Sequence, residues 1–336
     1  MCGRDIGDIR HSLIGLDERD RWRSALKDVD HDFGHTWDSC HAFSLTTRLP
    51  TYLYVAECPE GRVVCPLIER RFQGEADVAT PFGFSGFAGR GHCAGFVEEW
   101  RAFASRQGWI CAYVGQNPLL RPDGFWAEGA FEPAQNLYWL RIDDLDELHQ
   151  GLSRLRRRQL RRWRVPGWLC TDRDVLLRFV LESAEAFFQR VGAAPNYFLS
   201  EATWQALTAS DRVELLGALR DDRLVAVTFF GWADGIADAL FNISLPEGRD
   251  ASTALLIEGA ERLRTRGISL LNIGGGVRPG DDVERAKQLF GASARPLLHL
   301  KQVFAPSRFR RLCAAAGANA SGQTAFFPPY HSPARD

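Results

Sequence analysis

Lysine and methionine are scarce in this chain, and long apolar runs and paired-cysteine motifs are missing. Only three of the 41 basic residues are lysine (Lys27, Lys287 and Lys301), and the 336 residues include a single methionine. No apolar run approaches the roughly 20 residues of a membrane-spanning helix, and the charged start MCGRDIGDIRHS is unlike a signal peptide. The eight cysteines include no C-x-x-C pair, so reduced thiols are expected. We expect a cytoplasmic protein without membrane insertion.

The charge balance limits the kind of partner that the chain can bind, and the apolar content indicates how many packed cores it can form. Acidic residues (42) nearly balance basic ones (41), so a polyanion has to meet a local basic patch rather than an overall field, and no DNA partner is expected. An apolar fraction of 45% over this length is enough for about two packed cores. These values exclude a disordered or fibrous protein.

The two halves of the chain repeat one order of elements. In the first half the strands TYLYVAE and RVVCPLIERRF form a predicted hairpin, followed by a helix over 95–107 and the strand WICAYVG. In the second half the strands ELLGAL, LVAVTFFGW and IADALFNIS precede a helix over 252–266 and the strand ISLLNIGGG. Gly108 and Gly267 end the two helices, and the hairpin turns lie about the same interval apart. We therefore predict an α/β fold used twice, in domains 1–150 and 151–306, with a loose tail over 307–336.

A basic segment, GLSRLRRRQLRRWRVPG, joins the halves and predicts a linking helix over 151–165. Read as a helix, it places five arginines on the face opposite Leu152, Leu155 and Trp163: Arg154, Arg157, Arg158, Arg161 and Arg162. Several arginines with few acids between them repel one another unless a polyanion neutralises them, and RNA phosphates would do so. An ordinary solvated helix face is the alternative.

Four motifs resemble those of FemABX-type transferases. They are ISLLNIGGGVRPGDDVERAKQLFG near the end, DVATPFGFSGF in the first half, the LRRRQLRRWR helix, and FFQRVGAAPNYF before the second domain. The resemblance covers roughly residues 30–304. It implies two tandem GNAT-like (acetyltransferase-like) domains with mixed sheets packed by helices. It also implies transfer of an amino acid from aminoacyl-tRNA to an amine.

The sequence differs in three features from the family members that act on peptidoglycan precursors of the cell wall, and these differences concern the acceptor. The chain has no long heptad segment for a coiled-coil arm, Ala286 replaces the aromatic residue that often precedes the lysine, and residues 192–195 are small where a basic residue would be expected. The resemblance is therefore closer to relatives that extend natural-product peptides, including peptidyl-nucleoside antibiotics, and an acceptor of that kind in antibiotic biosynthesis is expected.

Lys287 is the predicted catalytic residue. Amide formation from an ester needs an oriented amine and positive charge where the oxyanion develops. On a helix over 283–290, Lys287 lies within about 60° of Val283 and Phe290, near the apolar face. The alternative is a lysine that only covers its own helix.

The Gly-rich strand end and the following acidic residues are further candidates. Gly275 and Gly276 belong to a GGG run that permits close backbone approach to a phosphate or a carbonyl oxygen, although a tight turn would explain it equally well. Asp281 is predicted to position an amine, or alternatively to cap the helix that follows.

The remaining candidates are predicted to line a substrate groove, with core packing as the alternative. Phe82 and Phe84 have same-side spacing in the PFGFSGF loop. The resemblance adds Arg190, Tyr197, Asn242 and Asn272.

A metal site is not expected. His31, His35, His41 and Cys40 are close in sequence, but they match no recognised ligand spacing. No G-x-S-x-G signature of a serine nucleophile is present either.

Three functions remain open at this point. The first is an aminoacyl-tRNA-dependent transferase acting on a small peptide or amine, with aminoacyl-tRNA as co-substrate and no bound cofactor. The second is an acyl-CoA-dependent N-acyltransferase, although the stretch LPEGRDASTALL lacks the usual Q/R-x-x-G-x-G/A loop. The third is an inactive RNA- or peptide-binding module, for which Lys287 would be dispensable. The oligomeric state cannot be predicted.

Overall fold

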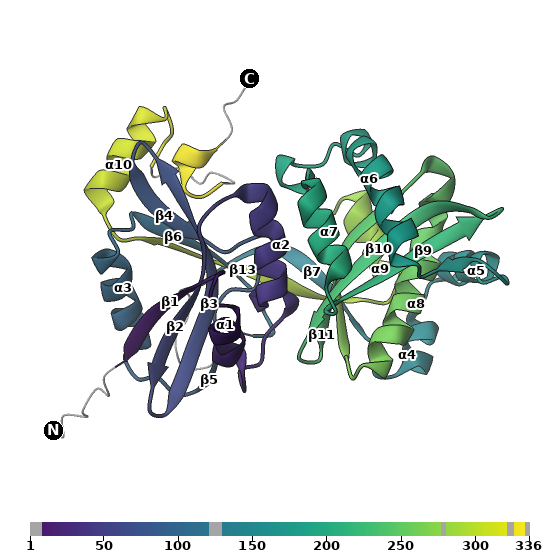
Figure 1. The fold of residues 1–336 in the computed structure, drawn as a ribbon, viewed down its shortest axis with the longest axis horizontal. Coiled ribbons are helices and arrows are strands. Elements are labelled where there is room, and N and C mark those ends of the chain that lie inside the picture. The colour runs from purple at the N-terminus through teal and green to yellow at the C-terminus, as the bar shows by residue number, and fades with distance from the viewer. Residues whose placement is uncertain (1–8, 121–129, 277–279, 321–325, 333–336) are drawn as a thin grey trace. The chain divides into compact units, whose positions relative to one another are not determined.

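The computed structural model describes residues 9–120, 130–276, 280–320 and 326–332, and it forms two compact units (Figure 1). The first unit comprises Met1–Cys40, Arg48–Ala134 and Leu297–Asp336, and the second comprises His41–Thr47 and Gln135–Pro296. Within each unit, the strands of the sheet pair in both parallel and antiparallel fashion.

The sheet of the first unit has the order β1-β2-β3-β4-β6-β13, with β5 paired to β3. Its strands are β1 (Arg10–Gly15), β2 (Thr51–Cys58), β3 (Gly61–Phe72), β4 (Glu75–Ala79), β5 (Ala88–Gly91), β6 (Cys111–Gln116) and the second half of β13 (Ser293–Val303). β4 and β6 are parallel, and the other pairs are antiparallel. The predicted hairpin of β2 and β3 and the predicted strand β6 are confirmed.

Helix α3 (Phe96–Arg106) covers one face of this sheet. Phe96, Trp100, Phe103 and Ala104 recur at helical spacing and are buried in its core. Gly108, with φ of +76°, follows the end of the helix, as predicted. The other helices of this unit are α1 (Arg19–Leu26), η1 (Phe33–His35), the start of α2 (Trp37–Thr47), α10 (Pro306–Ala315) and η4 (Pro329–His331).

The sheet of the second unit has the order β7-β12-β11-β10-β9-β8. Its strands are β7 (Glu132–Arg141, from Gln135 onward), β8 (Leu169–Cys170), β9 (Val213–Arg220), β10 (Arg223–Ala233), β11 (Ile236–Ser244) and β12 (Leu270–Gly275). β11 and β12 are parallel, and the other pairs are antiparallel.

Helices pack on both faces of this second sheet. They are α4 (Leu145–Gly151), α5 (Arg154–Trp163), α6 (Arg173–Arg190), η2 (Pro195–Tyr197), α7 (Glu201–Ala209), η3 (Pro246–Ala251), α8 (Ser252–Thr265) and α9 (Asp282–Gln288). Consecutive residues of β10 point to opposite faces: the Phe230 ring lies against Gly259 of α8, and the Phe229 ring is 5.4 Å from that of Trp204 in α7. α6 and α7 pack against each other (Figure 1). In the part of the chain that the structure describes, no helix is long and apolar enough to cross a bilayer.

The two units share one topology, as the repeated order of elements predicted. In each, three antiparallel strands lead through a helix (α3 or α8) to a fourth strand parallel to the third. The next strand in the chain then joins the other unit: β7 follows β6 but pairs with β12, and β13 follows β12 but pairs with β6.

This exchange gives unit boundaries that differ from the expected segments 1–150, 151–306 and 307–336. Tyr138 and Leu140 of β7 are buried in the core of the second unit, so that unit begins earlier than expected. The tail is also better anchored than expected, because Phe309 and Leu312 of α10 pack with Tyr330 in the first unit. Residues 321–325 and 333–336 of the tail lie outside the described residues.

Candidate functional site

Lys287 lies in the last turn of α9, which contacts strand β12. Its ammonium group donates a hydrogen bond to the carbonyl oxygen of Ile273. Burial lowers the pKa of Lys287 to about 8, and the Asp281 carboxylate opposes this shift. A cation that is shielded from water acts strongly on charge that develops beside it. Of the two apolar neighbours expected for Lys287, Phe290 is buried, but Val283 is 44% exposed, so the prediction that Val283 belongs to an apolar face was wrong.

The end of β12 brings further predicted residues to Lys287. Gly274 has φ of +78°, and a Cβ atom there would lie 3.0 Å from the Lys287 Nζ. The buried side chain of Asn272 accepts a hydrogen bond from the Gly274 N–H at 2.8 Å and donates one to Asp238 at 2.8 Å. The glycine run thus lets the lysine approach the main chain closely, while Asn272 fixes the path of that main chain.

Asp281 is the N-cap of α9. Its Oδ1 accepts a hydrogen bond from the Glu284 N–H at 2.7 Å, which confirms the capping alternative. Gly275 pairs with Leu137 of β7, and Gly276 follows the end of β12, so both lie at the same strand end as Lys287. The substrate roles of Asp281, Gly275 and Gly276 stay predictions.

Tyr138 and Glu284 form a contact near Lys287 that the sequence analysis missed. The buried Tyr138 hydroxyl donates a hydrogen bond to Glu284 Oε1 at 2.5 Å and accepts one from Gln288 at 3.3 Å. The bond from Tyr138 is the largest cause that holds the pKa of Glu284 below its usual range. These contacts join β7 to α9 and so help to orient the helix that carries Lys287.

Arg156 is a second residue that the sequence analysis missed. It is 9% exposed, whereas Leu155, expected on the anchoring face of the basic helix, is 41% exposed. The Arg156 guanidinium donates hydrogen bonds to Thr253 Oγ1 at 2.9 Å and to the Ala286 carbonyl at 2.8 Å, and it lies 4.1 Å from the centre of the Phe290 ring. It therefore joins α5 to α8 and to the residue before Lys287. The spacing of Arg156 with the buried Leu160 and Trp163, at i, i+4 and i+7, was the available signal.

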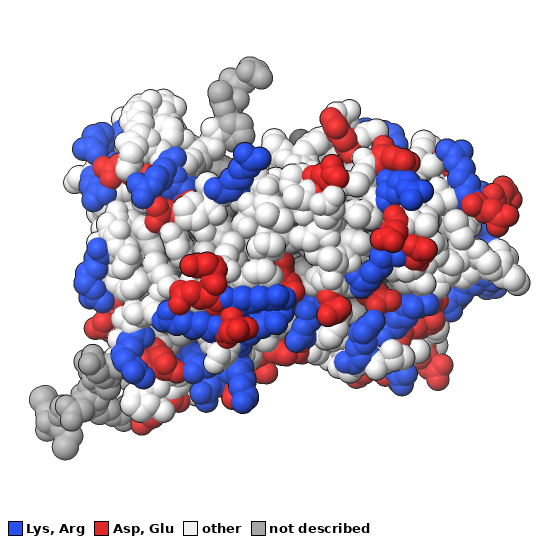
Figure 2. All heavy atoms as spheres, viewed as in Figure 1, with Lys and Arg blue, Asp and Glu red and all other residues white. Residues whose placement is uncertain are grey.

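The five predicted RNA-binding arginines are exposed on α5, and we call them the arginine stripe: Arg154, Arg157, Arg158, Arg161 and Arg162. Arg162 pairs with Asp250 at 3.1 Å. Within residues 9–120, 130–276, 280–320 and 326–332, the other four have no carboxylate within 4.0 Å. Over the face drawn in Figure 2, by contrast, acidic and basic residues are interspersed. A run of arginines lacking acidic partners is suited to an external polyanion.

Three groove candidates lie near the ends of α6 and β11. Arg190 donates a hydrogen bond to the Ser244 carbonyl at 2.6 Å, and Asn242 donates one to Thr228 at 2.7 Å. The Tyr197 ring is 37% exposed and lies among the aromatic rings of this unit. These contacts support a structural role for Arg190 and Asn242 and leave part of Tyr197 accessible.

Phe82 and Phe84 lie in the first unit, between β4 and β5, and both are partly exposed. Gly83 between them has φ of +101°. Because they belong to the other unit, the groove role of Phe82 and Phe84 stays a prediction.

The histidine cluster near residue 35 has structural partners. The buried His35 ring contacts Asp32 Oδ1 at 2.8 Å and the Gly86 carbonyl at 3.1 Å, and the Cys40 thiol donates to the Gly34 carbonyl at 3.3 Å. Across the described ranges, no group of three or more His, Cys, Asp or Glu side chains has an arrangement that could hold a metal ion.

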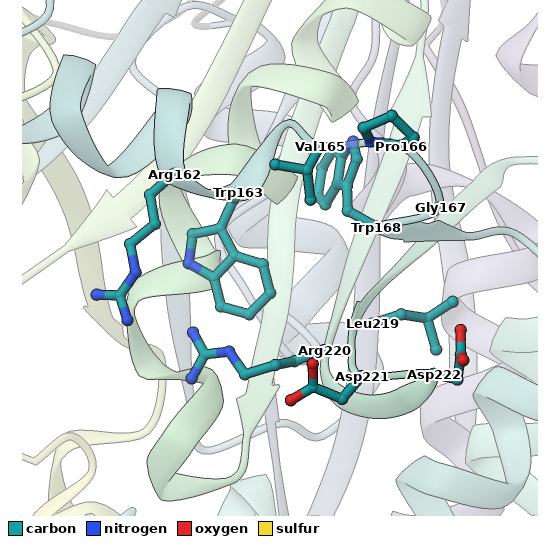
Figure 3. Close-up of a pocket in the computed structure, with 10 residues that line it drawn as sticks. All are labelled: Arg162, Trp163, Val165, Pro166, Gly167, Trp168, Leu219, Arg220, Asp221 and Asp222. Atoms are coloured by element: carbon teal, nitrogen blue, oxygen red, sulfur yellow. The ribbon is translucent and has the colours of Figure 1, made fainter.

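A pocket of about 340 Å³ lies where the end of α5 meets the β9–β10 hairpin (Figure 3). Trp163 and Trp168 form part of its lining, and Arg220, Asp221 and Asp222 of the hairpin border it. None of the sequence motifs except the end of the arginine stripe pointed to this pocket.

No family model and no curated protein matches the sequence. Among solved structures, the chain is similar to FemX (12% identity, TM-score 0.66, covering 90% of this chain and 99% of FemX). It is also similar to the C-terminal DUF2156 domain of a putative lysylphosphatidylglycerol synthetase from Agrobacterium fabrum (11% identity, TM-score 0.53, covering 92% and 99%). A third similar structure is a protein of unknown function from Bacteroides thetaiotaomicron (14% identity, TM-score 0.60, covering 88% and 100%). These similarities confirm the predicted FemX-like fold.

Proposed function

We propose that this protein transfers an amino acid from aminoacyl-tRNA to the amine of a small peptide or peptidyl-nucleoside-like acceptor. The observation that carries the proposal is the position of Lys287, a partly buried cation with a pKa of about 8 at a glycine-rich strand end. The helix that bears it is joined through Arg156 to the arginine stripe. Lys287 and the arginine stripe, to which we assign the oxyanion and the RNA phosphates, lie on connected elements of one unit.

The chemistry needs no covalent intermediate on the protein. The acceptor amine attacks the ester carbonyl carbon, a new C–N bond forms, and the negative charge of the tetrahedral intermediate develops on the former carbonyl oxygen. The C–O bond to the ribose then breaks, and the ribose hydroxyl leaves with the proton that the amine gives up. The Lys287 ammonium would donate a hydrogen bond to the oxyanion, exchanging the Ile273 carbonyl for that stronger acceptor. Asn272 and Gly274 would hold the strand end in place during this exchange.

The donor is proposed to be RNA rather than coenzyme A because of the local structure before α8. Gly248 is the one glycine in the stretch LPEGRDASTALL. A Cβ atom at Gly248 would lie 2.2 Å from the Val225 carbonyl oxygen, so this glycine is required for packing against β10. It does not form the glycine-rich turn with which acyl-CoA enzymes usually bind pyrophosphate. The arginine stripe offers phosphate contacts instead.

The acceptor is proposed to be a small amine-bearing peptide on the basis of the segment before α7. The residues that precede Tyr197 are small and uncharged (Gly192, Ala193, Ala194 and Pro195), and they add no basic group for a nucleotide-linked wall precursor. The exposed part of the Tyr197 ring would pack against such an acceptor.

The direct test is a transfer assay. The purified protein is incubated with total tRNA charged with a labelled amino-acid mixture and with an extract of small amine metabolites. We expect label to enter a small product, to disappear after RNase treatment, and to fall strongly in the Lys287→Ala variant. Mass spectrometry of the product then identifies the amino acid and the acceptor.

Two outcomes would overturn the proposal. If acyl-CoA supports acylation while charged tRNA does not, the protein is an N-acyltransferase with a different donor. If Lys287→Ala transfers label as fast as the wild type, the proposed role of the lysine is wrong. Lys301→Ala serves as the matched control, because Lys301 is in β13, where it pairs with Glu132 at 3.5 Å.

A further inference from the structure

We propose that the pocket at the end of α5 holds one unstacked nucleobase of an RNA strand whose phosphates contact the arginine stripe. This inference rests on the proposed function, because it gives the donor RNA a second contact besides Lys287. The pocket is built from α5, the segment that follows it, and the β9–β10 hairpin, all within the second unit (Figure 3).

The size and the walls of the pocket suit a planar base. Its volume of about 340 Å³ is near the lower limit of ligand sites, which run from about 300 to 1,000 Å³. Trp163 and Trp168 line it together with Leu219 (Figure 3), and because the two tryptophans are only 3% and 9% exposed, each offers a small part of its ring. Val165, which is 52% exposed, adds apolar surface at the rim. Aromatic and apolar surfaces of this kind bind bases that have left the stack.

The charges of the pocket favour a base over a phosphate. Arg162 and Arg220 line it, but both already pair with Asp250, at 3.1 and 3.3 Å. Arg220 also lies over the Trp163 ring, 4.4 Å from its centre. Asp221 and Asp222 add two exposed carboxylates. A phosphate here would meet negative charge, whereas the polar edge of a base would meet hydrogen-bond acceptors.

Those carboxylates predict which bases bind. Carboxylate oxygens accept hydrogen bonds, so Asp221 and Asp222 favour bases with an exocyclic amino group, namely cytosine, adenine and guanine. Uracil has no amino group. The pocket should therefore discriminate against uracil, while the arginine stripe binds every sequence alike.

The arginine stripe continues into the pocket. Arg162 belongs to both, and Arg158 and Arg161 precede it on the same helix face. From Arg162 back to Arg156 the axis of α5 spans roughly 9 Å, at about 1.5 Å per residue. Arg156 contacts Ala286, the neighbour of Lys287. A strand that follows α5 would therefore cover this distance with about three nucleotides at a stacked rise of about 3.4 Å each.

The test uses the full chain and two labelled RNA hexamers, hexacytidylate and hexauridylate, with binding followed by fluorescence anisotropy. We expect the wild type to bind hexacytidylate at least about fivefold more tightly than hexauridylate. In Asp222→Asn this preference should fall below about twofold, with Asp221→Asn as an independent second variant. Asp221 and Asp222 have φ of +51° and +59°, a conformation that asparagine also tolerates, so the hairpin should fold normally.

The arginine stripe gives the matched control. Replacing Arg158 and Arg161 together by alanine should weaken both hexamers equally, keep the base preference, and reduce the slope of log affinity against log salt by about 1.4. Thermal unfolding of each variant shows that it remains folded.

Four results separate the possibilities. Equal binding of the two hexamers by the wild type overturns the inference, and so does an Asp222→Asn variant that weakens both equally. If coenzyme A or ADP displaces the hexamers at far lower concentration than unlabelled RNA, the pocket binds the adenine of coenzyme A, and the inference that its ligand is RNA is wrong. If the hexamers behave as expected but no label moves from charged tRNA, the pocket inference stands and the proposed function fails.

Discussion

The ends of β6 and β12 occupy the same position in two units of one topology, yet their surroundings differ. At the end of β6, Gln116 and the following Asn117 are fully buried. The Gln116 side chain bonds both the N–H and the C=O of Phe87 at 2.8 Å, and Asn117 donates to Asp32 at 2.7 Å. At the end of β12 the glycines are partly exposed, and Lys287 with its lowered pKa lies beside them. One strand end is closed by a satisfied polar network, and the other lies beside a partly buried, titratable cation.

Asp32, a buried acid of the first unit, also differs from Lys287 in that its charge is fully matched by partners. Burial by itself would raise the pKa of Asp32, but the charge of His35 and hydrogen bonds from His35 and Asn117 hold it below its usual range. All of these partners are buried and hydrogen-bonded to one another, so this network stabilises the fold. The strand end of the first unit thus serves structure, whereas that of the second unit holds the lysine that we propose as catalytic.

The largest effect is expected at Lys287. Lys287→Ala should lower kcat by about 10²–10³-fold, because it removes a preorganised donor to the oxyanion. The melting temperature should change little, since the lysine makes one polar contact to Ile273. Initial rates in the transfer assay provide the measurement. If kcat of Lys287→Ala fell by less than tenfold, the end of β12 would be no more important for catalysis than the end of β6, and the contrast between the two strand ends would not hold.

The corresponding change in the first unit should affect stability and leave catalysis intact. Gln116→Ala removes the two hydrogen bonds that its side chain makes with the buried N–H and C=O of Phe87, at a cost of about 1–3 kcal/mol in the free energy of unfolding. The kcat of the folded variant should stay within about twofold of the wild type, since Gln116 lies in the first unit and Lys287 in the second. Denaturant titration measures the first quantity, and Gln205→Ala, at an exposed position of α7, is the control. Loss of activity with unchanged stability would place chemistry in the first unit.

Gly274 tests whether the open strand end is shaped for the lysine. Gly274→Ala should lower kcat by roughly tenfold, because the new Cβ atom would stand 3.0 Å from Lys287 Nζ in addition to straining the backbone. Gly267→Ala imposes a similar strain at φ of +83° but meets no atom within 4 Å, so it should cost only stability. If Gly274→Ala and Gly267→Ala had the same kcat, the close approach of Lys287 to Gly274 would not matter for catalysis.

Among the sites of the second unit, Arg156 should have the smallest effect on kcat. Arg156→Met keeps much of the buried volume and removes the bond to Ala286. Replacing a buried charge by an apolar side chain is often neutral for stability, so we expect little change in melting temperature and a several-fold lower kcat. An unchanged kcat would show that the contact between α5 and α9 does not position Lys287.

Local signals in the sequence were enough for the repeated fold. The helices that end at Gly108 and Gly267 follow from apolar spacing and a terminal glycine, both of which act over a few residues. The exchange of β7 and β13 was not predicted, because strand pairing is set by contacts between residues far apart in the sequence. The same holds for the contact of Tyr138 with Glu284, 146 positions away.

The candidate site was predicted in part. Lys287 and the glycines beside it were predicted because the motif that contains them resembles one of the FemABX-type transferases, and because the helical period places Lys287 near Phe290. Arg156 was overlooked since arginine is seldom buried, and burial here depends on the Phe290 ring and Thr253, which come from other elements. The lowered pKa of Lys287 also depends on the packing of β12 against α9, which no local pattern encodes.

The pH dependence of kcat tests the role of Lys287 most directly. Lys287 loses its charge as the pH rises through about 8, so kcat should fall by about tenfold per pH unit above that value once the acceptor amine is neutral. In Lys287→Arg the side chain stays charged, and the remaining activity should show no fall up to about pH 10. A falling limb at the same pH in both proteins would contradict the assignment of Lys287 as the cation that stabilises the oxyanion.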